Sequence, residues 1–211
     1  AIGQPRLMHL YADLFTVFSI DVAQILLTRS DFSNRLSYLN ARDSLNALLA
    51  HRVIPIVNEN DSIATEEIKL GDNDNLSALV ANLVDADLLV MLTDQPGLFT
   101  TDPRTNPGAQ LISTVDEISD ELWDIAGGTG SDLGTGGMLT KLKASRLAAR
   151  SGAHTVIASG NEGDVLARLL DGDDLGTLLT ADLTPMTARK RWIAGQLRAK
   201  GDLILDAGAA K

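Results

Sequence analysis

The chain has 211 residues, of which 45% are hydrophobic and 22% are charged, and this composition suits one globular α/β domain, or one domain with a fragment of another. Its formal net charge of −10 makes nucleic acid and membrane surfaces poor default partners, and the lack of cysteine excludes a disulfide framework and a thiolate nucleophile. No apolar run approaches the ~20 residues of a membrane span, so we expect a cytoplasmic protein.

Hydrophobic periodicity predicts alternating helices and strands along the chain. Leu7, Leu10 and Leu14 recur at helical spacing in the first element. Asp31 or Ser33 is placed to cap one long helix that continues to about residue 49. Helices are expected at residues 4–18, 31–49, 76–86 and 162–170, and strands at residues 21–28, 53–57, 87–92, 154–158, 176–180 and 190–194. Residues 95–110 are rich in proline and glycine and are expected to form a loop, before a short strand and a helix within residues 111–126.

Apolar strands that alternate with helices indicate a mostly parallel sheet between helical layers, an α/β/α sandwich. Pro55 places its strand at an edge of the sheet, or lies at the start of the strand. In such sheets ligands bind beyond the carboxyl ends of the strands. Three polar clusters are expected there: residues 58–61, residues 93–94 and residues 159–160.

A glycine-rich loop runs directly into a predicted helix over residues 134–152, GTGGMLTKLKASRLAARSG. Unpaired N–H groups and the positive end of the dipole make such a helix start an anion site, most often for phosphate. Lys141 and Lys143 follow within the helix, and a lysine there can accompany a moving phosphoryl group. The alternative is a plain connecting loop with solvating lysines. The loop is neither a G-x-x-x-x-G-K-[ST] motif nor a dinucleotide fingerprint.

Two clusters, residues 58–61 and 71–75, are dense in carboxylates and amides. Turn and cap chemistry explains each residue singly, with Asp74 or Asn75 as the cap of helix 76–86, whereas the two clusters together favour a polar small-molecule site. The clusters lack histidine and cysteine and the EF-hand pattern, so neither a zinc nor a calcium site is expected. The three histidines and two tryptophans are expected to be structural.

Several motifs taken together resemble the glutamate 5-kinases of the amino acid kinase family. They are VIPIVNEND, EIKLGDNDNLSALVA, LTDQPGLFTTDPR, GTGGMLTKLKAS and RKRWIAG, and the likeness runs through nearly the whole chain. The resemblance implies an α/β sandwich that transfers the γ-phosphoryl group of Mg·ATP to the side-chain carboxylate of L-glutamate. The product is the acyl phosphate that starts proline biosynthesis.

The resemblance also implies roles for individual residues. Asp61 and Asn73 would bind glutamate, with Asn58 as a weaker candidate, and Asp74 would orient the catalytic lysines. Lys141 would stabilise the transferring phosphoryl group. The residues expected to bind ATP are Thr93, Asp94, Thr135, Gly136, Gly137, Met138, Leu139, Thr140 and Lys141. No protein-held metal site is expected beyond the Mg²⁺ that accompanies ATP.

The family pattern further predicts an amino acid kinase domain over residues 1–195 and a linker with the start of a possible C-terminal domain over residues 196–211. The family's N-terminal strand, with its lysine and glycine turn, has no counterpart in this sequence. Glutamate and ATP are the expected partners, with inhibition by proline and homo-oligomer formation implied by the family. Two alternatives remain: a related kinase for acetylglutamate, aspartate, carbamate or UMP, or a non-catalytic module that binds nucleotide or amino acid.

Overall fold

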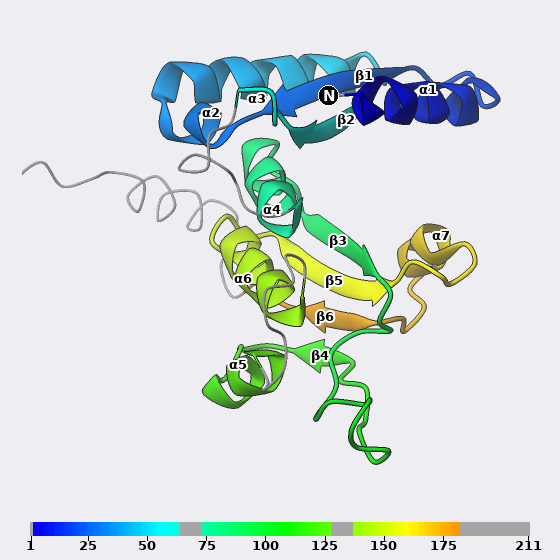
Figure 1. Cartoon of the computed structure of the whole chain (residues 1–211), viewed down its shortest axis with the longest axis vertical. Helices are drawn as coiled ribbons and strands as arrows, with labels where there is room; N and C mark the ends of the chain where they lie inside the picture. Colours follow the sequence, from blue (N-terminus) through cyan, green and yellow to red (C-terminus); the bar gives the residue numbers. More distant parts are fainter. Residues whose placement is uncertain (1, 64–72, 128–136, 182–211) are drawn as a thin grey trace, which may run out of the picture.

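The computed structural model describes residues 2–63, 73–127 and 137–181. Along the chain, its elements are α1 (Gly3–Thr16), β1 (Val22–Leu27), α2 (Arg29–Ser33), α3 (Arg35–Ala50), β2 (Ile54–Glu59), α4 (Asn73–Leu83), β3 (Leu88–Thr93), β4 (Thr114–Val115), α5 (Asp120–Gly127), α6 (Met138–Ala149), β5 (His154–Ser159), α7 (Val165–Leu170) and β6 (Thr177–Leu179) (Figure 1). The predicted strand 190–194 and the predicted boundary at residue 196 lie outside the described residues. None of the described helices is both long and apolar enough to cross a membrane.

The strands form two sheets that are parallel in most of their pairs. β1 pairs with β2 in one sheet, and the other has the order β3-β5-β6-β4. β3 with β5 and β4 with β6 are parallel, whereas β5 and β6 are antiparallel. The expected mostly parallel sheet is therefore confirmed. Among the described strands β2 pairs only with β1, which agrees with the edge position expected from Pro55.

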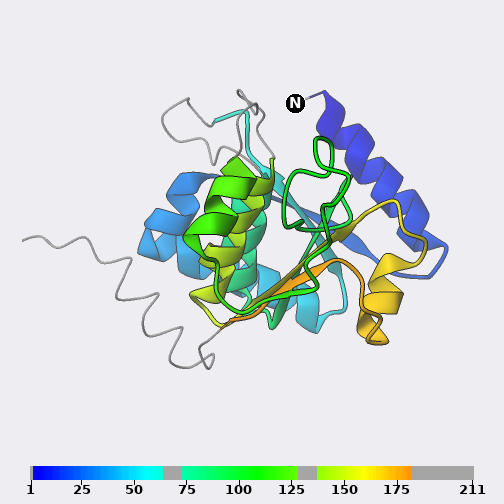
Figure 2. The ribbon, with the colours of Figure 1, turned by 90° about the horizontal axis from the view of Figure 1, so that it is seen from below.

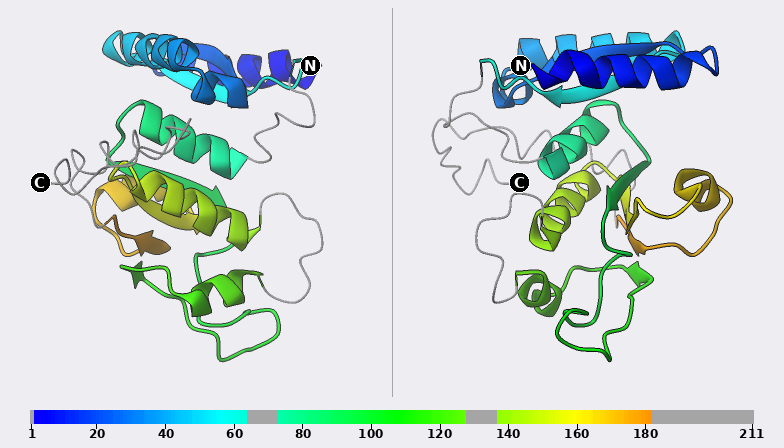
Figure 3. Two further views of the ribbon diagram at one scale, coloured as in Figure 1. Left: turned by 90° about the vertical axis from the view of Figure 1, so that its left-hand side faces the viewer. Right: turned by 45° about the vertical axis from the view of Figure 1, so that its right-hand side comes forward.

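Helices cover both faces of the larger sheet. α4, α5 and α6 lie on one side of β3, β5 and β6, and α7 lies on the other (Figures 2 and 3). Strand β5 shows why: Ile157 packs into the cluster that holds residues of α4 and α6, while Val156 and Ala158 pack against Val165 of α7. Because both faces are covered, five consecutive residues of β5 are buried, as is typical of a parallel strand between two layers.

Helix α4 joins the two sheets. Leu76 packs with Leu27 of β1, while Ala78 and Ala81 belong to the core of the larger sheet. The helix therefore presents one apolar strip to each sheet, and its position determines how the two halves of the molecule sit together (Figure 1).

Helix boundaries differ from the sequence expectation, most clearly at Asn34 and at the start of α4. The single helix predicted for residues 31–49 is broken at Asn34, whose backbone is extended and whose side chain accepts hydrogen bonds from the N–H groups of Leu36 and Ser37 at 2.9 and 3.1 Å. The Asp31 side chain accepts from the backbone N–H of Thr28 at 2.7 Å and so belongs to the capping box at the start of the short helix α2. Helix α4 begins at Asn73, so Asp74 lies in its first turn and is not its cap.

Candidate active site

The starts of α4 and α6 lie at the same edge of the larger sheet as the ends of β3 and β5. Each helix leads through a short turn into its strand, α4 into β3 and α6 into β5, so helix and strand run in opposite directions. At the ends of the strands Thr93 is the register partner of Ser159, and the N–H of Gly160 donates to the Thr93 carbonyl at 2.7 Å. This edge is the carboxyl edge, where open α/β sheets bind their ligands.

An ion pair joins the first turns of α4 and α6. The Lys141 ammonium lies 3.2 and 3.1 Å from the two carboxylate oxygens of Asp74, and the side chains are only 8% and 15% exposed. The Thr140 hydroxyl is within 2.6 Å of Asp74 Oδ2 and of the Gly137 carbonyl. Both Asp74 oxygens are thus held, so the carboxylate fixes the position of the ammonium.

Helix electrostatics favour Asp74 in this position and disfavour Lys141. A carboxylate in the first turn of α4 lies at the positive end of the helix dipole, whereas a lysine in the first turn of α6 adds charge of the same sign as the dipole end. A nearly buried ammonium also loses hydration, and a close carboxylate offsets that loss. The start of α6 remains a positive region that favours an anion.

Gly137 leaves the start of α6 open. It occupies the N-cap with an extended backbone, and no side chain caps the helix there. A Cβ placed on Gly137 would meet no atom of the described residues within 4 Å, so packing among them does not require glycine at this position. Among the described residues, nothing therefore stands between a ligand and the backbone at Gly137.

The loop after β3 is anchored to the sheet through Thr177. Thr93 and Asp94 are joined by a hydrogen bond of 3.1 Å, and the chain then turns back towards β6. There the buried hydroxyl of Thr177 accepts from the N–H of Leu98 at 2.8 Å and donates to the Ile112 carbonyl at 2.6 Å. A Cβ on Gly97 would lie 2.6 Å from that hydroxyl, so only glycine allows this approach.

Comparisons with known proteins place the chain in a family. The profile of the amino acid kinase family matches residues 1–159. This protein belongs to the amino acid kinase family. Over its full length it is 55% identical to a glutamate 5-kinase of Shewanella oneidensis, and it is also 55% identical to one of Azoarcus sp.; it spans 57% of the length of each.

Solved structures support the fold of the amino acid kinase family. An isopentenyl phosphate kinase of T. acidophilum, solved as a product complex, superposes with a TM-score of 0.57 at 16% sequence identity. That match covers 83% of this chain and 66% of the other. At this level of identity the likeness concerns the fold alone.

The structure brings together some of the residues that the family pattern selects. Lys141, Thr140 and Asp74 are in direct contact, and Gly137, Met138 and Leu139 form the start of the same helix. Thr93 and Asp94 lie at the end of β3, on the carboxyl edge. Thr135 and Gly136 lie outside the described residues.

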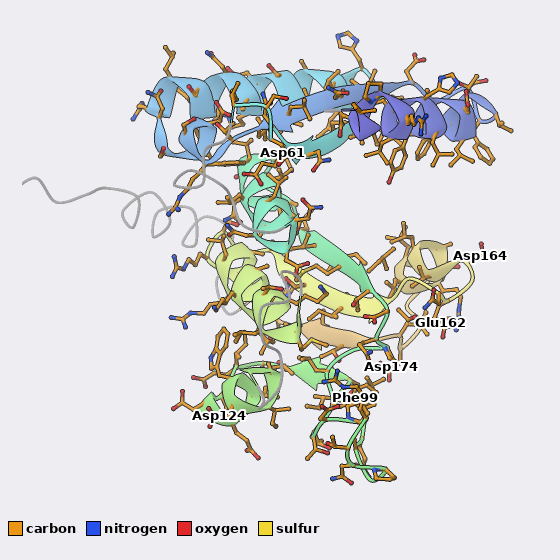
Figure 4. The ribbon with its side chains drawn as sticks, viewed as in Figure 1. Asp61, Phe99, Asp124, Glu162, Asp164 and Asp174 are labelled. Carbon is orange, nitrogen blue, oxygen red and sulfur yellow. The ribbon has the colours of Figure 1, made fainter. Side chains whose placement is uncertain are left out.

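Among the described contacts, none joins the three candidates for glutamate binding to the Asp74–Lys141 ion pair. Asp61 is exposed on the turn after β2 (Figure 4), and Asn73 is the exposed first residue of α4. The Asn58 amide donates to Gln4 of α1 at 3.1 Å, so part of its bonding capacity is used within the fold. Asn73 alone adjoins the pair in sequence, as the neighbour of Asp74.

Sequence reasoning missed the long-range partners of several polar side chains. It assigned Thr140 to nucleotide binding, but the hydroxyl contacts Asp74, which lies 66 positions earlier. Thr177 and Asn82 were not singled out at all, and both are buried with hydrogen-bond partners in distant segments. Period and motif describe neighbours along the chain, so no sequence signal pointed to these contacts.

A separate cavity of about 540 Å³ lies between α5 and α6 and is lined by Asp120, Trp123, Lys143, Arg146, Leu147 and Arg150. The three cations of the cavity are Lys143, Arg146 and Arg150. Because an α-helix turns by about 100° per residue, they lie about 140–200° around α6 from Lys141. The cavity is therefore not part of the candidate site. Within the described ranges no group of three or more acidic or histidine side chains could hold a metal ion.

Proposed function

We propose that the protein containing this chain transfers the γ-phosphoryl group of ATP to the side-chain carboxylate of L-glutamate, the first step of proline biosynthesis. The observation that carries the proposal is the Asp74–Lys141 pair at the open start of α6, on the carboxyl edge of the sheet. The relatives named glutamate 5-kinase, at 52–56% identity over 99–100% of the chain, supply the choice of acceptor.

The reaction needs positioning and charge neutralisation more than proton transfer. A glutamate side chain is already ionised at neutral pH, so its oxygen can attack the γ-phosphorus without a general base. The new O–P bond forms as the bond from phosphorus to the departing ADP oxygen breaks. Lys141 would neutralise charge on the transferring group, while Asp74 and Thr140 hold its ammonium in place.

The residues present fit a bound nucleotide. The uncapped start of α6, with Gly137 as N-cap, can accept phosphate oxygens through its backbone N–H groups, and Thr93 and Asp94 lie at the neighbouring strand end. Mg²⁺ bound with ATP would neutralise phosphate charge. It keeps several waters and needs only one or two carboxylates besides the phosphates, so a dense acidic cluster is not required. Asp61, Asn73 and Asn58 remain the candidates for glutamate.

We also propose inhibition by proline, assembly into a homo-oligomer and a place in the cytoplasm. These three proposals rest on the resemblance to glutamate 5-kinases. The likeness to the isopentenyl phosphate kinase does not favour another substrate, since fold alone does not select the acceptor.

The test compares Lys141→Ala with Lys143→Ala in the polypeptide that the gene encodes. Both lysines lie on α6, but Lys143 is exposed and about 200° away around the helix. We expect Lys141→Ala to lower kcat by about 10²–10³ or more while ATP still binds, and Lys143→Ala to act like wild type. Hydroxamate trapping measures acyl phosphate formed from glutamate, aspartate and acetylglutamate, and ADP release measures transfer to UMP, which forms no hydroxamate. Near-normal kcat for Lys141→Ala would refute the assignment, and preference for another acceptor would refute the substrate.

A further inference from the structure

The far ends of α4 and α6 are joined by a second polar contact. Asn82, in the last turn of α4, is 4% exposed. Its amide donates to the carbonyl of Leu147 at 3.2 Å, and its Oδ1 accepts from the hydroxyl of Ser151, just after α6 ends. The Leu147 carbonyl also accepts from the backbone N–H of Arg150 at 3.2 Å, so Asn82 is a second donor, from a different helix, to a carbonyl in the last turn of α6.

The two helices are therefore connected at both ends. Asp74 and Asn82 are eight residues apart on α4, which corresponds to about 12 Å at about 1.5 Å per residue. Thr140 and Leu147 are seven residues apart on α6, or about 10.5 Å. The nearly equal spacings suit two helices that run side by side in the same direction, as the views show (Figures 1 and 3).

Small side chains from both helices are buried between the two polar connections, beside Leu142 of α6. Ala78 and Ala81 of α4 and Ala144 and Ala148 of α6 are all buried in one cluster. Alanines pack closely but interlock weakly, so apolar packing here resists a sliding motion less than long side chains would. The directional hydrogen bonds of Asn82 supply the axial register that the alanines leave loosely defined.

We propose that Asn82, with Ser151, is a positioning pair for the phosphoryl-transfer site. It fixes the axial register of α4 against α6 and thereby the position of the Lys141 ammonium relative to Asp74 and the bound phosphate. The kinetic part of this inference rests on the proposed function. A misplacement of about 1 Å remote from the chemistry can cost about 10²-fold in rate, so a small slip of one helix is enough to matter.

The kinetic test uses Asn82→Ala and Ser151→Ala in the full encoded polypeptide. We expect kcat to fall by about 10- to 100-fold while the KM values for ATP and glutamate change by less than about threefold. The control is Val165→Ala, a buried α7 residue on the other face of the sheet, which loses thermal stability through its cavity but keeps wild-type kcat below its Tm. Ser151→Ala removes a hydroxyl that donates to Asn82 and to the Ala148 carbonyl at a half-buried turn, and it keeps the test valid if Asn82→Ala does not fold.

The double variant of Asn82 and Lys141 distinguishes a positioning role of Asn82 from a general loss of structure. If Asn82 acts through Lys141, Asn82→Ala lowers kcat no further in a Lys141→Ala background. Unchanged kcat in both single variants, or a full additional loss in that background, would overturn the inference.

A stability measurement tests the same register without any substrate. Asp74→Asn and Asn82→Ala are too far apart for direct contact, so independent sites would give additive losses in Tm. A shared register predicts that the double variant loses less than the sum, because the second change acts on helices that have already slipped. Additive losses in Tm would refute the proposal that the two contacts fix one common register of α4 against α6. If the wild type does not turn over glutamate, the proposed function alone is refuted. The Tm comparison of the single and double variants then still decides whether Asn82 fixes the helix register.

Discussion

Two buried threonines of the larger sheet predict opposite outcomes for the same substitution. Thr177 is 0% exposed and its hydroxyl makes two hydrogen bonds, to the Leu98 N–H and the Ile112 carbonyl. Thr155 is 1% exposed, and its hydroxyl has no hydrogen-bond partner among the described residues. Valine has nearly the shape of threonine, so Thr→Val at each site removes the hydroxyl with little change in packing.

At Thr177 the substitution leaves a buried N–H and a part-buried carbonyl without their partner. An unsatisfied buried group costs about 1–3 kcal/mol, and the part-buried carbonyl costs about 1 kcal/mol because water can reach it, so we expect a loss of about 2–4 kcal/mol, which lowers the Tm by roughly 4–16 °C for a domain of this size. At Thr155 the hydroxyl is already desolvated without compensation. Thr155→Val is therefore expected to be neutral or to raise the Tm by a few degrees.

Thermal and urea unfolding of both variants in parallel give these free energies. Since Thr177 also anchors the loop after Thr93 and Asp94, Thr177→Val should raise the KM for ATP, and Thr155→Val should not. Equal losses of stability at the two positions would refute the reasoning, because burial and shape are matched and only the hydrogen bonds differ.

Three further predictions concern single contacts. Asp61→Asn should raise the KM for glutamate far more than that for ATP, because the carboxylate would lose a charge-assisted bond to the substrate ammonium; a rise confined to ATP would place Asp61 with the nucleotide. Asn34→Ala should lower the free energy of unfolding by about 0.5–2 kcal/mol in urea titrations, since α3 loses its cap, whereas Asn34→Gly should cost only a few tenths. The hydrogen bond from the Arg104 side chain holds the pKa of Asp102 below its usual value, so its small contribution to stability is present above the usual carboxyl pKa and fades as pH falls. Arg104→Ala should return the Asp102 pKa towards that usual value in an NMR titration, and an unmoved pKa would contradict this cause.

Much of the fold could be predicted from sequence because its determinants are local. Both strands β3 and β5 are apolar runs, with β5 buried on both faces and β3 buried mainly through Leu89 and Met91, and their bounds differ from the predicted ones by only one residue at one or both ends. The break at Asn34 was missed because the helical pattern continues across it. An N-cap such as Asn34 changes the backbone conformation of a single residue, while the spacing of the apolar residues on either side continues. Hydrophobic periodicity alone therefore does not reveal the break.

The candidate site was predictable in its parts and not in its contacts. Motifs selected Asp74 and Lys141 separately, and the topology then brings them to one edge through the packing of α4 on α6. The bonds that hold this arrangement, from Thr140 to Asp74 and from Asn82 to Leu147, join positions 66 and 65 residues apart. Such contacts depend on the register of two helices, which no window of a single sequence contains.

The Asp74–Lys141 pair itself predicts that stability and catalysis can be separated. Removing one partner of a nearly buried pair leaves the other charge without compensation, so Asp74→Asn and Lys141→Met should each lower the Tm. The loss should be smaller than the 3–5 kcal/mol of a fully buried pair, because Asp74 keeps 15% of its side chain exposed. In the double variant no uncompensated charge remains, so the Tm should return most of the way to that of the wild type. Phosphoryl transfer should stay as low as in Lys141→Met, because the transferring group still lacks its cation. Unfolding scans and hydroxamate assays on the three variants decide the matter. If the loss in Tm of the double variant equals the sum of the single losses, the two charges do not compensate each other. Asp74 would then not hold the Lys141 ammonium in place as we infer.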